Sequence, residues 1–348
     1  MGKIYRSITE LVGKTPLLEL ANYEKKHDLP AKLLVKLEYF NPNQSIKDRA
    51  ALNMIEEAEK KGLIKPGDTL VETTSGNTGI GLAAIAATKG YKFRVYIQDQ
   101  VSAERFQVIK AFGAEVIKLS EEPVIVETME KTGGDFIAAV AALRDQVLAK
   151  EEGIFFVDQL SNPANPAVHE STTGPEIWEA SDHQVTHFVA GIGTGGTISG
   201  TGRYLKEASD GAVQVIGADP EGSIYSNPND VHQYSIEGVG EDFYPKAFDR
   251  ELPDEIVQVN DAEAFEMTRR LAAEEGLLVG GSSGMAVTAA LKYAREHDLD
   301  EDQLVVVLLP DSGRSYMEKI FNDDWMRANG FADVVEHTSK PSLAEQYL

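Results

Sequence analysis

The sequence predicts an α/β fold with two lobes, each built on a mostly parallel, twisted sheet flanked by helices. Short apolar runs typical of strands alternate along the chain with stretches of helical periodicity. Parallel strands need helical crossovers, so this alternation indicates parallel sheets that are covered on both faces. A chain of 348 residues also exceeds the length that one hydrophobic core usually serves, which favours two lobes.

The predicted strands are short runs rich in Val, Ile, Leu and Phe, and the predicted helices have apolar residues at i, i+3, i+4 and i+7. The strands are 33–37, 69–72, 93–97, 115–119, 154–157, 187–190, 213–217 and 304–309. The clearest helical patterns lie within 51–58, 80–87, 103–112 and 136–148. Residues 221–253 carry few periodic signals and several turn formers, which is typical of a long functional loop.

The composition excludes several classes of partner. A net charge of −23 argues against nucleic acid and against an anionic membrane surface. No apolar run approaches the roughly 20 residues that a membrane span needs, and residues 1–10 lack the apolar core of a signal peptide. The chain has no cysteine, which excludes disulfides, thiolate metal sites and a cysteine nucleophile. We therefore expect a cytoplasmic protein without a metal site.

Lys47 lies where a helix is expected to begin. Ser45 is a favourable N-cap residue, and Asp48 stands at the spacing of a capping box. A lysine in the first turn meets the positive end of the helix dipole, which favours the neutral amine over the ammonium form. The neutral amine is the form that reacts with carbonyl groups. A solvated surface lysine is the alternative that this segment alone leaves open.

Residues 74–79, with the sequence TSGNTG, follow a predicted strand and precede a predicted helix. Glycines and small hydroxyl residues at a helix N-terminus expose backbone amides, and such a place binds carboxylate or phosphate. Ordinary helix capping by Ser, Thr and Asn explains the same residues without a ligand. The loop is therefore a candidate anion site with a plain structural alternative.

Residues 191–197, with the sequence GIGTGGT, also follow a strand and open a helix. Their glycines let the backbone approach an anion closely, so a phosphate cradle is the favoured interpretation. The loop also matches G-x-G-x-x-G at Gly191, Gly193 and Gly196, and Asp219 ends the next strand. A dinucleotide-binding loop of an NAD-dependent dehydrogenase is therefore an alternative, and a tight packing turn is another.

Residues 280–284, with the sequence GGSSG, precede a further helix. The serines could cap that helix, or a buried serine hydroxyl could hold a ring nitrogen without charging it. The dinucleotide interpretation explains only one of the three loops. A reactive lysine, a phosphate cradle, a carboxylate cradle and a serine for a ring nitrogen together describe pyridoxal phosphate holding an amino acid.

These segments resemble those of fold-type II pyridoxal phosphate enzymes and occur in the same order along the chain. Residues 8–17 (ITELVGKTPL) resemble the N-terminal signature of these enzymes, and residues 41–49 (NPNQSIKDR) resemble their Schiff-base segment. The resemblance extends from Tyr5 to about Gly330. It implies the two-lobed fold of that group, pyridoxal 5'-phosphate as cofactor and a homodimer.

Within this group the chain resembles the cysteine synthase/cystathionine β-synthase family. Segments 219–224, 237–240, 280–284 and 309–317 are more similar to cystathionine β-synthase, in its bacterial form that consists of the catalytic core. Segment 158–166 is more similar to cysteine synthase, and Leu160 stands where eukaryotic cystathionine β-synthases tend to carry tyrosine. Because the chain starts close to the catalytic domain, lacks cysteine and stops at Leu348, we expect neither haem nor activation by adenosylmethionine.

The resemblance also assigns roles to residues of this sequence. Lys47 would form the internal aldimine and then act as the acid–base group. The other implied cofactor contacts are the phosphate ligands Gly193, Thr194, Gly195, Gly196 and Thr197, the ring-hydroxyl donor Asn77 and the pyridine-nitrogen partner Ser282. The implied substrate contacts are the carboxylate ligands Thr74, Ser75, Thr78 and Gln159, with Glu237 and Gly238 on the side of the thiol.

The implied reaction is a β-replacement with small-molecule amino-acid and thiol substrates. Serine or O-acetylserine would lose its β-substituent to give an aminoacrylate, which homocysteine would attack to give L-cystathionine. A hydroxyl at Ser282 leaves the ring largely neutral, which disfavours a long-lived carbanion and favours β-elimination. Sulfide as the thiol would give cysteine, as in a cysteine synthase. A dehydrogenase, or a non-catalytic relative that binds only the cofactor, would also account for part of the pattern.

The resemblance also suggests how the lobes divide the chain. We expect a large cofactor-binding domain from residues 1–40 and 149–335, a small mobile domain from residues 41–148, and a C-terminal tail at 336–348. Closure of the lobes on the bound carboxylate would keep water from the reacting substrate.

Overall fold

The computed structural model describes residues 4–27, 29–74, 76–99 and 103–338. The chain forms two compact units. The smaller unit consists of residues 1–12 and 47–165, and the larger unit consists of residues 13–46 and 166–348. Each unit has its own sheet and its own hydrophobic cores, as the α/β prediction requires.

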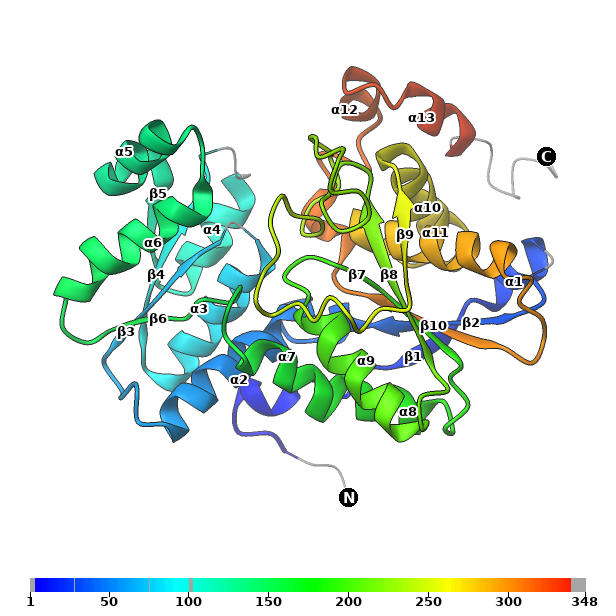
Figure 1. Ribbon diagram of the computed structural model, residues 1–348, viewed down its shortest axis with the longest axis horizontal. Helices are drawn as coiled ribbons and strands as arrows, with labels where there is room; N and C mark the ends of the chain where they lie inside the picture. The colour runs from blue at the N-terminus through cyan, green and yellow to red at the C-terminus, as the bar shows by residue number, and fades with distance from the viewer. Residues whose placement is uncertain (1–3, 28, 75, 100–102, 339–348) are drawn as a thin grey trace. The chain divides into compact units, whose positions relative to one another are not determined.

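In the part of the chain that the structure describes, the sheet of the larger unit has six strands (Figure 1). Their spatial order is β1 (Leu17–Glu19), β2 (Lys32–Leu37), β10 (Leu304–Leu309), β7 (His187–Gly191), β8 (Gln214–Pro220) and β9 (Glu255–Val259). All neighbours are parallel except β1 and β2, which pair antiparallel at the edge. The carboxyl ends of β7 and β8 lead into the glycine-rich loop and the long loop, respectively.

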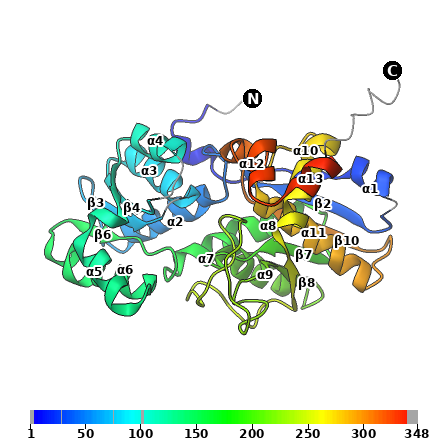
Figure 2. The same ribbon diagram turned by 90° about the horizontal axis from the view of Figure 1, so that it is seen from above.

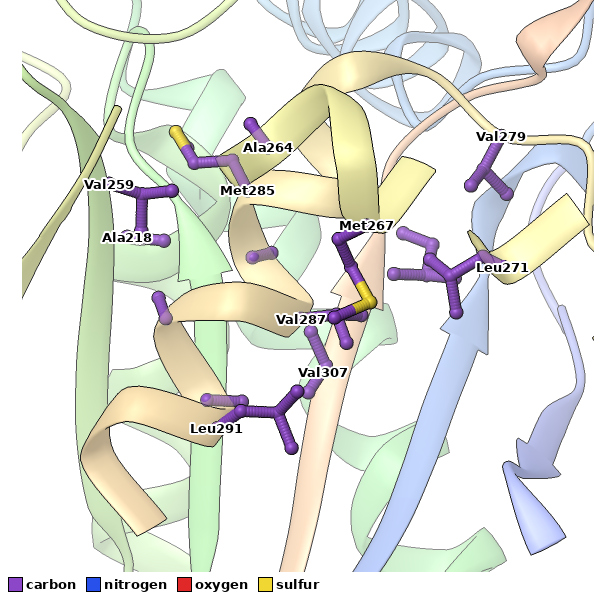
Figure 3. Close-up of a cluster of buried hydrophobic side chains, with 14 of the residues drawn as sticks. Ala218, Val259, Ala264, Met267, Leu271, Val279, Met285, Val287, Leu291 and Val307 are labelled. Carbon is purple, nitrogen blue, oxygen red and sulfur yellow. The ribbon is translucent and has the colours of Figure 1, made fainter. Parts of the chain in front are cut away.

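Alternating side chains of these strands enter two cores, because successive residues of a strand point to opposite faces. Val305 and Val307 pack with helices α10 (Asp261–Glu275) and α11 (Gly281–Glu296), whose side chains meet those of the sheet in Figure 3. Val306 and Leu308 pack on the other face with helices α8 (Gly174–Ala180) and α9 (Gly196–Ala208). Figure 2 shows the same unit from above. Both faces are covered, which explains the continuous apolar sequence of β10.

The described residues of the smaller unit form a four-stranded parallel sheet in the order β5 (Glu115–Lys118), β4 (Lys92–Ile97), β3 (Thr69–Thr73) and β6 (Ile154–Phe156). Helices α2 (Lys47–Lys60), α3 (Asn77–Lys89) and α4 (Ala103–Ala111) bury one face, where Leu70 lies. Helices α5 (Pro123–Thr132) and α6 (Phe136–Gln146) cover the face where Val71 lies.

The remaining elements are short connections. They are η1 (Ile8–Leu11), α1 (Ala21–His27), η2 (Glu38–Phe40), η3 (Leu119–Glu121), η4 (Leu148–Lys150), α7 (Ala164–Val168), η5 (His169–Thr173), η6 (Gly313–Tyr316), α12 (Asp323–Ala328) and α13 (Ala332–Thr338). Residues 221–253, all of which the structure describes, contain no helix or strand, as predicted. The tail expected from residue 336 begins inside α13, and residues 339–348 lie outside the described residues.

The division into units differs from the expected boundaries at both ends of the smaller unit. Strand β6 pairs with β3, so the chain stays in the smaller unit to residue 165 and not to residue 148. Residues 1–12 also belong to this unit, where η1 contacts α3. The sequence reveals neither assignment, because a short strand carries no sign of the sheet that it joins.

Candidate functional site

Helices α3, α9 and α11 each begin directly after a glycine, at Gly76, Gly195 and Gly280. A glycine at the N-cap has no side chain that could accept from the first-turn amides. Helices α10 and α12 differ, because the side chains of Asn260 and Asn322 accept from their first turns. The predicted loops therefore leave helix N-termini to be satisfied by other groups, which is the arrangement expected of anion sites.

The loop before α9 contains glycines whose main chain is approached closely by the long loop. Gly195 has φ 78°, a conformation that favours glycine, and a Cβ there would overlap Phe248. At Gly193 a Cβ would lie 2.6 Å from the carbonyl oxygen of Gly238. Because the long loop packs directly on the glycines, side chains are excluded and backbone amides line the place. A glycine loop at a helix N-terminus is the kind of place that binds a phosphate.

Tyr225 of the long loop fixes this cradle. Its phenol Oη donates to the carbonyl oxygen of Gly193 at 2.7 Å, and its ring packs edge-on against Phe248 with centroids 5.0 Å apart. Burial raises the pKa of the Tyr225 phenol, and the nearby carboxylate of Glu241 adds to this effect. The phenol therefore stays protonated and remains a donor. Sequence patterns did not indicate Tyr225, since its loop has no period.

The hydroxyl groups of the cradle are also held in place. The Thr194 hydroxyl accepts from the amide of Gly196 at 3.4 Å. The Thr197 hydroxyl lies 3.4 Å from Nε2 of His169, a buried residue whose Nδ1 is 2.9 Å from the hydroxyl of Thr173. His169 opens the π-helical turn η5, and such turns are frequent at functional sites.

Asp219, the acid that the dinucleotide alternative requires, makes a hydrogen bond within the protein instead. It is fully buried, and its Oδ2 accepts from the backbone amide of Ser226 at 2.9 Å. Burial raises the pKa of the Asp219 carboxyl. A dinucleotide enzyme needs this acid at a ribose hydroxyl. Asp219 instead holds the start of the long loop.

The serine-rich loop lies in the first turn of α11. Ser282 and Ser283 are both buried, and the Ser283 hydroxyl has no hydrogen-bond partner among the described residues. A Cβ at Gly284 would overlap the carbonyl oxygen of Ala264 and the hydroxyl of Thr268, so α10 and α11 cross closely here. The turn therefore presents buried hydroxyls on a rigid helix pair, as a ring-nitrogen site would require.

Glu237 and Gly238 also lie in the long loop of the larger unit. Lys319 Nζ donates to the Glu237 carboxylate at 2.5 Å. Gly238 has φ 81° and supplies the carbonyl oxygen that lies against Gly193. Of the two predicted thiol-side residues, Gly238 therefore lies against the 191–197 loop, and the charge of Glu237 is balanced by a lysine.

In the smaller unit, Lys47 is the first residue of α2 and is half-buried. The helix starts within one residue of the expected position after Ser45. A Cβ at Gly81 would lie 3.2 Å from the Lys47 carbonyl oxygen and 3.3 Å from Asp48 Oδ1. Glycine at this position lets α3 pack closely on the first turn of α2, where Lys47 lies.

The 74–79 loop, which is predicted to bind the substrate carboxylate, is connected to Gln159 by a hydrogen bond. Thr78 lies in the first turn of α3, and its hydroxyl donates to Gln159 Oε1 at 2.7 Å. Thr74 follows β3, Asn77 opens α3, and Ser75 lies outside the described residues. Glu72, which sequence reasoning missed, accepts from the Gln159 amide at 3.0 Å. The sequence did contain a signal for Glu72, namely an ionisable residue within a strand that is predicted to be buried.

Two broader features are shown by the described part of the chain. None of its helices combines the length and apolar character needed to cross a membrane. Nor does it contain a group of three or more His, Asp or Glu side chains placed to hold a metal ion.

The family described as "Pyridoxal-phosphate dependent enzyme" matches residues 8–311 of the chain. Cystathionine beta-synthase of Oryctolagus cuniculus is 42% identical over 343 residues, which cover 97% of this chain and 60% of the relative. The enzyme of the same name from Saccharomyces cerevisiae is 41% identical, over 94% of this chain and 65% of the relative. The chain thus spans about three fifths to two thirds of the length of these curated relatives.

Solved structures give the same result for the fold. A hydrogen sulfide-producing enzyme from Fusobacterium nucleatum superposes with a TM-score of 0.82 at 37% identity, covering 91% of this chain and 99% of that one. O-ureido-L-serine synthase has a TM-score of 0.80 at 36% identity, covering 94% and 100%. These similarities confirm the fold-type II prediction, and the chain belongs to the family of pyridoxal-phosphate dependent enzymes.

Proposed function

We propose that the protein catalyses a β-replacement in which serine or O-acetylserine condenses with homocysteine to give L-cystathionine. The observation that carries this proposal is the glycine cradle at the start of α9, closed by Tyr225, in a chain whose curated relatives are named cystathionine beta-synthase. The glycine cradle suits a phosphate, which supports pyridoxal phosphate. Asp219 is buried and accepts from the amide of Ser226, which argues against its use at the ribose of a dinucleotide.

The residues of this chain divide the work of holding the cofactor. The amides and hydroxyls of 193–197 would bind its phosphate, Asn77 would donate to its ring hydroxyl, and Ser282 would hydrogen-bond its ring nitrogen. Lys47 would carry the covalent attachment and would then move the proton at the substrate α-carbon. When bound, the cofactor supplies the electron sink that allows the β-substituent to leave. The helix-start position of Lys47 favours its neutral amine for this chemistry.

The 74–78 loop and Gln159 bind the α-carboxylate of the amino acid. The uncapped start of α3 supplies backbone amides, and Gln159 supplies a side-chain amide. Thr78 has a single hydroxyl proton, and it donates this proton to Gln159. Its contribution therefore consists of orienting Gln159, while Thr74 and Ser75 remain direct candidates for the carboxylate.

Glu237 and Gly238 are proposed for the side of the incoming thiol. Gly238 packs against the phosphate cradle, which supports a place near the reacting atoms. Sulfide as the second substrate, giving cysteine, is the alternative that one observation favours: segment 158–166 is closer to cysteine synthase in sequence. A structural neighbour is named as a hydrogen sulfide-producing enzyme, which supports sulfur chemistry on this fold.

We further propose a homodimer that acts in the cytoplasm. Exposed apolar side chains support an intersubunit surface, among them Ile4, Tyr5, Ile8 and Leu11 near the N-terminus. The lack of cysteine agrees with a reducing compartment. Analytical ultracentrifugation of the purified holoenzyme would show twice the 38.0 kDa chain mass, whereas a concentration-independent monomer would contradict the proposal.

A four-way steady-state assay tests the reaction by crossing serine and O-acetylserine with homocysteine and sulfide. We expect cystathionine formation from homocysteine to be the fastest of the four reactions. Faster cysteine formation from sulfide would assign the protein to cysteine synthesis instead, and turnover of none of the pairs would reject β-replacement.

Lys47→Ala tests the attachment site, with Lys60→Ala in the last turn of the same helix as a matched control. Lys47→Ala should lose the yellow absorbance of the covalently held cofactor and all measurable turnover, because the linkage is formed by the amine that this variant lacks. Lys60→Ala should retain both, since Lys60 is exposed and its ammonium group pairs with Glu57 on the helix surface. An unchanged spectrum in Lys47→Ala would disprove the assignment.

A further inference from the structure

Glu72 is a buried carboxyl group in the smaller unit that the proposed reaction does not use. It lies in β3 between Val71 and Thr73 and is 2% exposed. Burying a carboxyl group is costly unless it is hydrogen-bonded. Burial, with a smaller contribution from the nearby Asp158, raises the pKa of Glu72 to about 8, against the lowering effect of two backbone hydrogen bonds. The position of such a group requires an explanation.

The two oxygens of Glu72 hold two separate segments of backbone. Oε1 accepts from the amide of Thr73 at 2.8 Å, and Oε2 accepts from the amide of Gln159 at 3.0 Å. The β3–β6 ladder ends just before, where the amide of Val157 donates to the carbonyl oxygen of Val71 at 2.9 Å. Asp158 then turns away with φ 55°. Glu72 therefore continues the connection between the segments after the regular pairing stops.

Gln159 is held at two further points. Its carbonyl oxygen accepts from Asn165 Nδ2 at 2.9 Å, and its side-chain Oε1 accepts from the Thr78 hydroxyl at 2.7 Å. Since the side-chain oxygen is engaged, the NH₂ group points the other way and is the end that can donate to a carboxylate. Glu72, Thr78 and Asn165 together fix both the place and the orientation of this donor.

We propose that Glu72 is a positioning residue for the binding of the substrate carboxylate, acting through the backbone of Thr73 and Gln159. This inference rests on the proposed function, because it takes Gln159 as a carboxylate ligand. A carboxyl group suits this role, since in either protonation state each of its two oxygens keeps a lone pair for one amide, whereas a glutamine has one acceptor oxygen. The residue does not touch the cofactor in this role, so cofactor binding is independent of it.

Glu72→Gln is the decisive variant, because it keeps the side-chain volume and removes one of the two acceptors. The matched control is Glu24→Gln in the larger unit, where Glu24 Oε1 accepts from the amide of Leu33 at 2.6 Å and burial also raises the carboxyl pKa. The probe is L-alanine, which has no β-substituent to lose and therefore binds without elimination. Its dissociation constant is measured by absorbance titration of the holoenzymes.

Glu72→Gln should weaken alanine binding and raise the KM of the amino-acid substrate by about tenfold, with kcat changed less than about threefold. The cofactor absorbance should match that of wild type, and Glu24→Gln should leave alanine binding unchanged. Wild-type affinity for alanine in a folded Glu72→Gln holoenzyme would overturn the inference. A wild-type enzyme that binds alanine but forms neither cystathionine nor cysteine would reject the proposed reaction and leave the inference standing.

A measurement on the wild-type holoenzyme covers the case in which Glu72→Gln does not fold. Hydrogen exchange should show the Gln159 amide exchanging at least about a hundredfold more slowly than an unprotected amide, already without alanine, because Glu72 accepts from it. Unprotected exchange at this amide would overturn the inference without any variant.

Discussion

The phosphate cradle of the larger unit and the carboxylate loop of the smaller unit both lie at a helix start that follows a glycine, but they are held in different ways. Around Gly193 and Gly195 the contacts are close and mainly steric, from Phe248 and Gly238, with one phenol hydrogen bond from Tyr225. Around Thr78 and Gln159 the contacts are hydrogen bonds that end on the buried carboxyl of Glu72.

The difference matches what each place is proposed to bind. A resident cofactor benefits from a cradle that is rigid before binding, since preorganised contacts cost less on binding. A substrate enters and leaves in every turnover, and a hydrogen-bonded network can be optimised for orientation more than for affinity. Substitutions in the cradle should therefore change cofactor affinity, whereas substitutions in the network should change the KM of the amino acid.

The largest effect is expected from Gly195→Ala. The residue has φ 78°, and the added methyl group would overlap Phe248. The left-handed backbone and the overlap together cost roughly 2–5 kcal/mol. Since about 2 kcal/mol corresponds to about a thirtyfold change in affinity, cofactor affinity should fall at least by that factor. Titration of the apoenzyme with cofactor measures the change. Gly113→Ala is a control, because Gly113 also has positive φ but has open space around it; an equal loss there would contradict the steric explanation.

The next effect concerns stability and pH. The carboxyl pKa of Glu72 is raised from 4.5 to about 8 in the folded protein. Between these values the folded state binds a proton that the unfolded state lacks, so the stability contributed by Glu72 falls as pH rises from 4.5 to 8. The difference in Tm between wild type and Glu72→Gln should therefore shrink over this range, by the equivalent of up to a few kcal/mol.

Calorimetry of both proteins at several pH values measures that difference. A difference in Tm that does not change between pH 5 and pH 8 would show that Glu72 does not carry the proton, and a difference that widens with pH would reverse the sign of the argument.

Tyr225→Phe should have a smaller effect. It removes the hydrogen bond to the Gly193 carbonyl oxygen and keeps the ring packed on Phe248. One hydrogen bond contributes about 1 kcal/mol, which is about a fivefold loss of cofactor affinity. The KM of the amino acid, measured with saturating cofactor, should stay the same. A change in KM alone would show that Tyr225 serves the substrate and not the cradle.

Thr78→Val should have a comparable or slightly smaller effect, confined to the substrate. The valine fills the same volume and removes the hydroxyl that orients Gln159. The KM of the amino acid should rise about threefold to fivefold, with cofactor affinity unchanged. Steady-state kinetics and apoenzyme titration on one preparation measure both quantities, and a loss of cofactor affinity would contradict the separation of the two places.

Much of the fold could be predicted because buried parallel strands are continuous apolar runs. All eight predicted strands are present, within one residue at their ends except that β8 continues three residues farther, to Pro220. Strands β1 and β9 were missed because they are edge strands, with three residues in one and charged or polar residues in the other. Helix α10 was missed although Asn260 and Glu263 form its capping box, a signal that sequence alone contains.

The candidate site was predictable where chemistry depends on local sequence and not where it depends on tertiary contacts. Glycine loops at helix starts are local, so Gly193, Gly195 and the first residue of α2 could be recognised. Tyr225 and Phe248 contact glycines that lie tens of residues away in the sequence, and the loop that carries them has no periodic pattern. Glu72 lies in a recognised strand, but its partner Gln159 is 87 residues away.

The central claim is that the cofactor phosphate and the substrate carboxylate are bound by separate sets of residues. The most direct measurement is a pair of dissociation constants, for cofactor and for L-alanine, determined on both Gly195→Ala and Glu72→Gln. We predict that Gly195→Ala loses cofactor affinity and, once saturated with cofactor, binds alanine as wild type does, whereas Glu72→Gln does the opposite. Parallel loss of both affinities in both variants would contradict the claim.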